Sequence, residues 1–142
     1  MREVYSALVD EIFIVEKNRT GPVPIRDYTS VPNFVLEWSE CGIGAVKADT
    51  WNDFKAKNSD KSRLEGPFNL STNCSLVNEN DNPQALEIVG LSRVGFDPER
   101  TLALVHADDI AVWGISTGYL VLLKNEDGAW NVEQMTVTYF GE

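Results

Sequence analysis

Apolar residues near the start of the chain recur every three or four positions. The stripe consists of Val4, Leu8, Ile12 and Val15 and is widened by Tyr5, Val9 and Phe13. This spacing is that of one face of an α-helix, and acidic residues occupy much of the opposite face. The pattern therefore predicts an amphipathic helix from Arg2 to about Lys17, which ends before the Gly21-Pro22-Val23-Pro24 breaker.

The last third of the chain, Leu86 to Tyr139, contains four β-rich apolar runs separated by turn signals. The predicted strands are Leu86 to Phe96, Thr101 to Ala107, Ile115 to Lys124 and Ala129 to Tyr139. Asp97-Pro98-Glu99-Arg100 has proline at the second turn position, and Glu126-Asp127-Gly128 is a hairpin signal. The first run alternates only if Gly90 or Gly95 admits a bulge, and the last run has apolar residues on both sides of an irregularity. This order predicts an antiparallel meander.

The middle of the chain carries weaker signals. It predicts short strands at Val23 to Tyr28 and Pro67 to Val77, and short helices near Asn33 to Glu40 and Trp51 to Lys57. We therefore expect an α+β fold: an N-terminal amphipathic helix and short helices packed on a curved antiparallel sheet of about four to five strands. The length of 142 residues fits a single domain, 1–142.

Charge narrows the choice of partners. The chain has 22 acidic and 12 basic residues, which gives a net charge of -10. Such a surface repels phosphate backbones and anionic membrane faces and attracts basic proteins, so we expect no nucleic acid ligand and suspect a basic protein partner. The alternative is that acidity only keeps the protein soluble. No apolar run approaches the roughly 20 residues that span a bilayer, so no membrane span is expected.

Metal and cofactor motifs are missing from the sequence. Cys41 and Cys74 fit neither a CxxC pair nor a His-Cys cluster, and the calcium-loop spacing DxDxDG does not occur. The two cysteines allow one disulfide or two buried thiols, and both alternatives stay open. We therefore predict no metal site and no cofactor.

Two places carry candidate binding residues. A wide loop is predicted from Asp108 to Trp113, where Asp108, Asp109 and Trp113 leave the regular pattern together. We interpret them as partner-binding residues, with the exposed indole as an anchor. Arg93 lies in an apolar strand and must reach solvent or a carboxylate. It predicts a structural ion pair, with Glu87 or an acidic residue of the first helix, or else an anion clamp.

The segments VYSALVDEIFIVEKN, IRDYTSV, WNDFKAKN, SRVGFDPERTLALVHA and GYLVLLKNEDGAWNV cover most of the chain. Their order resembles a broad family of small, uncharacterised bacterial proteins that are often exported. The resemblance implies a shared α+β fold and no established activity, so no residue role is carried over. A signal peptide is missing from the sequence as given, which suggests a cytoplasmic protein or an exported mature domain with Met1 added.

Three functions compete. The first is a non-catalytic acidic binding protein, of the inhibitor or immunity type, for a basic partner. The alternative is an exported or envelope-associated small-ligand-binding domain, with its pocket on the concave side of the meander under the first helix. The third is an enzyme in which His106, the only histidine, works with Asp108 or Asp109. It is the weakest, so we lean against an enzyme, and the sequence leaves the oligomeric state open.

Overall fold

The computed structural model describes the backbone of residues 2–16, 23–26, 43–44, 46–59, 74–77, 87–111 and 116–141. The elements are α1 (Arg2–Leu8), η1 (Val9–Glu16), β1 (Val23–Arg26), α2 (Ala48–Lys57), β2 (Cys74–Val77), β3 (Glu87–Leu91), β4 (Gly95–Phe96), β5 (Leu102–Ala111), β6 (Ser116–Glu126) and β7 (Ala129–Gly141). The helix predicted at Asn33 to Glu40, the first part of the predicted strand Pro67 to Val77, and Cys41 lie outside the described residues.

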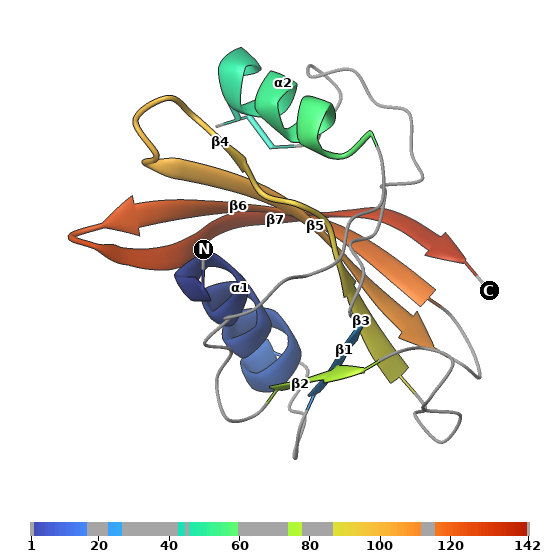
Figure 1. Ribbon diagram of the computed structural model, residues 1–142. Coiled ribbons are helices and arrows are strands. Elements are labelled where there is room, and N and C mark those ends of the chain that lie inside the picture. The colour runs from blue at the N-terminus through green and yellow to red at the C-terminus, as the bar shows by residue number, and fades with distance from the viewer. Residues whose placement is uncertain are drawn as a thin grey trace.

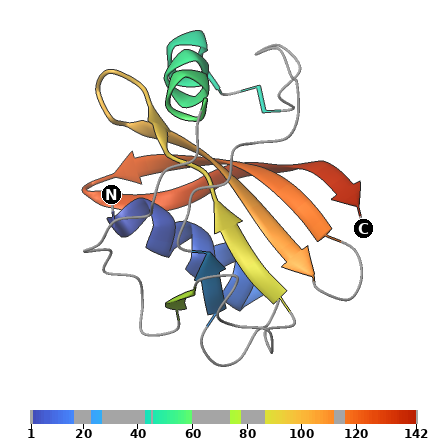
Figure 2. The ribbon, with the colours of Figure 1, turned by 45° about the vertical axis from the view of Figure 1, so that its right-hand side comes forward.

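The strands form one sheet between two helical layers. Its order is β2-β1-β3-β5-β6-β7, and β4 pairs with β5 alongside β3. Strands β3, β5, β6 and β7 run antiparallel, whereas β1 is parallel to both β2 and β3. In Figure 1 and Figure 2, α2 lies over one face of the sheet, and α1 lies over the other. The predicted α+β fold with an antiparallel sheet is confirmed, but the described sheet has seven strands rather than four to five, and the two parallel pairings of β1 were not predicted.

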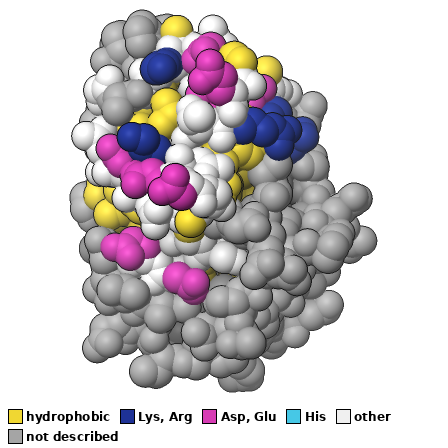
Figure 3. Space-filling view, turned by 90° about the vertical axis from the view of Figure 1, so that its left-hand side faces the viewer, with side chains coloured by type: hydrophobic (Ala, Val, Ile, Leu, Met, Phe, Trp, Pro, Cys, Tyr) yellow, Lys and Arg dark blue, Asp and Glu magenta, His cyan; other side chains and the backbone are white. Residues whose placement is uncertain are grey.

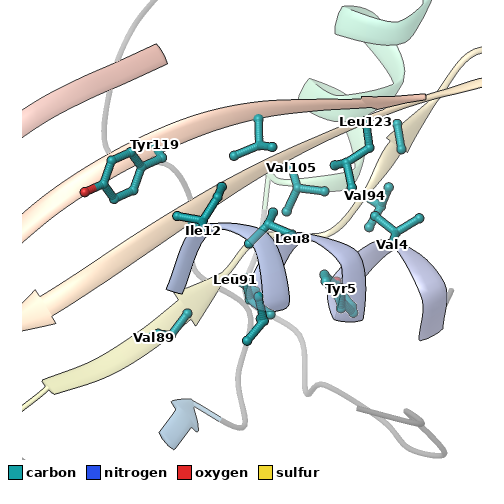
Figure 4. Close-up of a cluster of buried hydrophobic side chains, with 14 of the residues drawn as sticks. Val4, Tyr5, Leu8, Ile12, Val89, Leu91, Val94, Val105, Tyr119 and Leu123 are labelled. Carbon is teal, nitrogen blue, oxygen red and sulfur yellow. The ribbon is translucent and has the colours of Figure 1, made fainter. Parts of the chain in front are cut away.

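The N-terminal helix is confirmed, but it changes character half-way. Its first half is an α-helix and its second half, η1, is a π-helix with wider turns. Val4, Leu8 and Ile12 are buried, as the apolar stripe predicted. They pack on the side chains that β5 and β6 direct to this face: Ala103, Val105, Ala107, Tyr119, Val121 and Leu123. Figure 4 shows this cluster filling the space between the helix and the sheet.

The other face of the same strands is covered by α2 and the residues before it. Trp51 and Phe54 pack with Ile43 and Val46 on the alternate side chains of the sheet, Leu104, Leu120 and Leu122. Strands buried on both faces lose the polar alternation of a half-exposed sheet, which is why β5 and β6 are nearly continuous apolar runs. The predicted helix Trp51 to Lys57 is confirmed and begins three residues earlier, at Ala48.

The predicted strand Leu86 to Phe96 is interrupted rather than continuous. It divides into β3 and β4, with Ser92 to Val94 between them. The predicted turns are confirmed: the Arg100 N–H donates to the Asp97 carbonyl over 3.0 Å, and Asp127 and Gly128 adopt φ of 54° and 87° at the hairpin. The irregularity expected in the last strand is also present, as two register shifts between β6 and β7.

Among the described residues, no helix combines the length and the apolar character needed to cross a bilayer.

Candidate functional site

Asp108 and Asp109 do not lie in a loop, so that part of the sequence interpretation is wrong. Strand β5 continues to Ala111, and it pairs with β3 on one side and β6 on the other through both aspartates. Their exposed fractions are only 8% and 7%. Pairing on both sides overrides the poor strand propensity of adjacent aspartates. The pair is therefore not an exposed acidic surface, and Trp113 lies outside the described residues.

His106 belongs to a buried polar network that spans three strands. Its Nε2 lies 2.8 Å from Thr138 Oγ1 on β7, and its Nδ1 lies 3.5 Å from Asp108 Oδ1. Burial lowers the pKa of His106, and the Asp108 carboxylate opposes this only in part. In space, a hydroxyl, an imidazole and a carboxylate follow one another here in the order found in a nucleophilic triad. Because the imidazole has no exposed surface, the arrangement fits a structural role, in which the His106–Thr138 contact ties β5 to β7 across β6.

Arg93 is exposed in the connection between β3 and β4. Its guanidinium donates to the Lys57 carbonyl over 3.5 Å, and no described carboxylate forms an ion pair with it. The predicted structural ion pair is therefore not found in the described part of the chain, and the Glu87 side chain lies outside it. The backbone of Arg93 is instead held by Asn58, whose Oδ1 accepts from the Arg93 N–H at 2.8 Å and whose Nδ2 donates to the Arg93 carbonyl at 3.0 Å.

A groove of about 540 Å³ lies between α2 and the turn that joins β4 to β5. We call it the α2 groove. It is lined by Asp49, Asn52, Asp53 and Lys57 from the helix and by Phe96, Asp97, Pro98 and Arg100 from β4 and the turn. Sequence reasoning missed this site because its two walls are separated by about 40 residues, although the short helix Trp51 to Lys57 and the proline turn were each predicted.

The nearly buried side chain of Phe96 connects the two walls of the α2 groove. The Phe96 N–H donates to Asp53 Oδ2 over 2.7 Å, and the same oxygen pairs with Lys57 Nζ at 2.8 Å. Lys57 Nζ lies 5.2 Å and the Arg100 guanidinium carbon 4.8 Å from the ring centroid. These distances are those of cation–π contacts. The helix and the turn are thus joined through one ring and one carboxylate.

Asp97 holds the turn in shape. Its carboxylate accepts hydrogen bonds from the backbone N–H groups of Thr101 and Leu102, at 2.8 and 2.9 Å, and from the Thr101 hydroxyl. Burial favours a higher pKa for Asp97, but these hydrogen bonds outweigh it and the pKa is lowered. Arg100 adopts φ of 56°, a left-handed conformation that the bonded turn maintains.

Asp53 is ionised for a related reason. Burial favours a higher pKa, but hydrogen bonds from Lys57 and the Phe96 N–H, with the charges of Lys57 and Arg100, lower it overall. The α2 groove thus combines three carboxylates with the cations of Lys57 and Arg100, and exposed Asp49 can accept hydrogen bonds from a cationic or other donating group. Among the described residues, no three metal-ligating side chains converge.

Figure 3 views the molecule from the side where the β4–β5 turn and the β6–β7 hairpin lie. Acidic and basic side chains are interspersed there around exposed apolar atoms. Such a mixed surface suits a polar contact with apolar contributions rather than a purely electrostatic one.

Comparison with protein-family models, with curated proteins and with solved structures finds no match to this chain. The resemblance to small bacterial proteins therefore stays a prediction.

Proposed function

We propose that this chain is a non-catalytic binding protein for a basic protein partner, of the inhibitor or immunity type, and that the α2 groove receives a cationic anchor side chain. The observation that carries the proposal is the groove itself, where three aspartates outnumber two basic residues, Lys57 and Arg100, around the edge of the Phe96 side chain. The net charge of -10 adds long-range attraction for a basic partner.

The groove's carboxylates divide into two roles. Asp53 and Asp97 are held by Lys57 and by the turn backbone, so they shape the groove. Asp49 and Asn52 are exposed and lie three positions apart on α2, which places them on one side of the helix. Their side-chain oxygens are therefore the acceptors a partner would meet first.

An arginine of the partner fits this chemistry best. A guanidinium is planar, donates to two oxygens at once and packs its flat face on apolar surface. Asp49 and Asn52 supply oxygens, and Pro98 supplies apolar surface on the facing wall. Buried arginine anchors of this kind dominate the affinity of many interfaces, while surrounding charges mainly raise the association rate.

The space under the first helix gives less support to a ligand-binding role. Side chains of the helix and the sheet fill it (Figure 4). The α2 groove is therefore the feature on which a binding role rests.

Selection from a displayed library of random peptides tests the proposal, with the full chain as bait. We expect enrichment of peptides that contain arginine next to an apolar residue. Asp49→Asn should lower the affinity of the chain for the selected peptides by about tenfold or more, as removal of an anchor contact does. Asp127→Asn is the matched control, because it makes the same change at an exposed position in the β6–β7 turn, away from the α2 groove lining.

Both variants change the net charge equally, so nonspecific attraction falls equally in both. Equal weakening by Asp49→Asn and Asp127→Asn would show that binding depends on overall charge rather than on the groove. Enrichment of acidic or uncharged peptides would overturn the proposal as a whole.

A further inference from the structure

Strand β7 forms one edge of the sheet. It is 13 residues long, Ala129–Gly141, and among the described strands it pairs only with β6. An edge strand presents a row of backbone N–H and C=O groups on its outer side, to which another strand can pair. Natural proteins often protect such an edge with lysine, proline, several charges or β-bulges. Here Glu133 is the only charged residue in the strand, and it contains no proline or lysine.

The regular part of this edge is short and central. Register shifts occur between Leu122 and Leu123 and between Gly118 and Tyr119 of β6, so Glu133 and Thr138 of β7 are bulged. Between them, Gln134 to Val137 pair without interruption. A bulge bends and twists a strand, so pairing with another strand is most favourable in this central window.

The window carries both large hydrophobic side chains that are exposed among the described residues. Met135 is 37% exposed and Val137 is 45% exposed. Their partners on β6 are Val121 and Tyr119, which face α1. Directly opposed residues in a sheet share a face, so Met135 and Val137 lie side by side on the α1 face. Thr136 between them points to the other face.

We propose that β7 pairs with the β7 strand of a second copy of this chain, antiparallel and about a two-fold axis at Thr136. In this register Met135 lies directly opposite the partner's Val137, and Val137 lies opposite the partner's Met135. Each exposed hydrophobic side chain then gains a cross-strand apolar neighbour, which adds side-chain packing to the backbone pairing. The sheet becomes continuous across the two copies.

A second copy fits this edge better than a basic protein does. With Glu133 as its only charge, the strand offers little to attract cations. A two-fold contact instead requires a surface complementary to itself, and the spacing of Met135 and Val137 about Thr136 meets that requirement. Each copy carries a net charge of -10, so their repulsion must be overcome by a contact that is nearly uncharged.

Salt separates this association from the proposed function, on which it does not depend. Screening reduces repulsion between two acidic copies, so self-association should strengthen as ionic strength rises. Binding of a basic partner should weaken under the same change. Sedimentation of the full chain over a range of concentrations, at low and high salt, measures the first effect directly.

Val137→Lys should abolish the dimer, because it places a lysine opposite Met135 on each side of the axis. Ala56→Lys is the matched control, since Ala56 is exposed on α2 and the substitution adds the same charge away from the edge. Circular dichroism confirms that both variants are folded. A wild-type chain that stays monomeric at every concentration and salt, or equal association of the two variants, overturns the proposal.

The register has its own test. In a Cys41→Ser, Cys74→Ser background, Thr136→Cys should form an intermolecular disulfide, because opposed Cα atoms about 4.5–5.5 Å apart suit one. Gln134→Cys lies on the same face but two positions from the axis, so it should not cross-link with its own equivalent. Equal cross-linking by the Thr136→Cys and Gln134→Cys variants would contradict this register. The sedimentation experiment keeps both native cysteines, so it tests the dimer even if the serine substitutions disturb the fold.

Discussion

Gly95 on β4 lies directly against the backbone of Phe54 on α2. A Cβ atom added to Gly95 would stand 2.5 Å from both the Cα and the Cβ of Phe54, which is too close for non-bonded carbon atoms. Because Phe54 lies between Asp53 and Lys57 on the same helix, this close approach also positions one wall of the α2 groove. One missing side chain therefore sets the distance between helix and strand.

Gly95→Ala should lower the free energy of unfolding by about 2–3 kcal/mol, because the clash is with backbone atoms that move only if α2 shifts. Urea denaturation measures this change in the free energy of unfolding. Gly44→Ala is the control, because a Cβ there meets no atom within 4 Å, and it should change stability by less than about 0.5 kcal/mol. Equal stability of the two variants would contradict the close packing of α2 on β4.

Asn58→Ala should destabilise the fold by about 2–4 kcal/mol. The Asn58 amide donates to Phe54 O at 2.9 Å and to Arg93 O, and it accepts from Arg93 N. Each lost hydrogen bond counts about 1 kcal/mol, and the buried groups left without a partner add to the loss. Asn52→Ala, exposed on the same helix, should be neutral or slightly stabilising, since alanine is the better helix former. Thermal unfolding compares the stabilities of the two variants, and equal stabilities would contradict the role of the Asn58 amide.

Asp97→Asn should reduce stability at pH 7 by about 1.5–3 kcal/mol, because hydrogen bonds from the Thr101 and Leu102 N–H groups to a charged carboxylate become bonds to a neutral amide. The pKa of Asp97 is lowered in the folded state. Its stabilisation is therefore present above the unfolded pKa of 3.8 and is lost as pH falls through the folded pKa.

The wild-type chain should thus lose more stability than Asp97→Asn between neutral pH and about pH 3. Asp127→Asn serves as the control, since Asp127 is exposed at φ of 54°, where asparagine is well tolerated. Chemical denaturation across this pH range gives the comparison. Parallel pH profiles for the wild type and Asp97→Asn would argue against a charged cap on the turn.

His106 should make the fold sensitive to mild acid. Its pKa in the folded state is lowered from the ordinary value of 6.5. The unfolded chain therefore takes up a proton first as pH falls. Stability is fully present above about pH 6.5 and declines below it until the folded pKa is reached. The chain has only one histidine, so side-chain titration in this range can be assigned to it.

His106→Gln should remove this decline between about pH 7 and 5 while lowering stability at neutral pH. Asp108→Asn keeps the histidine and removes the carboxylate 3.5 Å from Nδ1, so it should depress the pKa of His106 further. Imidazole resonances followed by NMR report the pKa in each protein. A pKa at or above the ordinary value in the folded wild-type chain would refute the buried neutral histidine.

Local patterns in the sequence determined several elements of this fold. The apolar stripe led to the helix beginning at Arg2, the Asp97-Pro98 turn and the Asp127-Gly128 hairpin were predicted correctly, and the meander from β3 to β7 followed from its apolar runs. These features depend on residues close together in the chain, where side-chain period and turn conformation act directly.

Only the tertiary structure decided what depends on distant segments. Asp108 and Asp109 are in a strand because β3 and β6 pair with it on both sides. Likewise, Asp53 and Phe96 share a hydrogen bond across 43 positions, and no local pattern relates them. Burial, parallel pairing and the α2 groove require contacts between segments that are distant in the chain. Local sequence therefore specifies the helices, strands and turns, whereas tertiary packing determines which side chains are in contact.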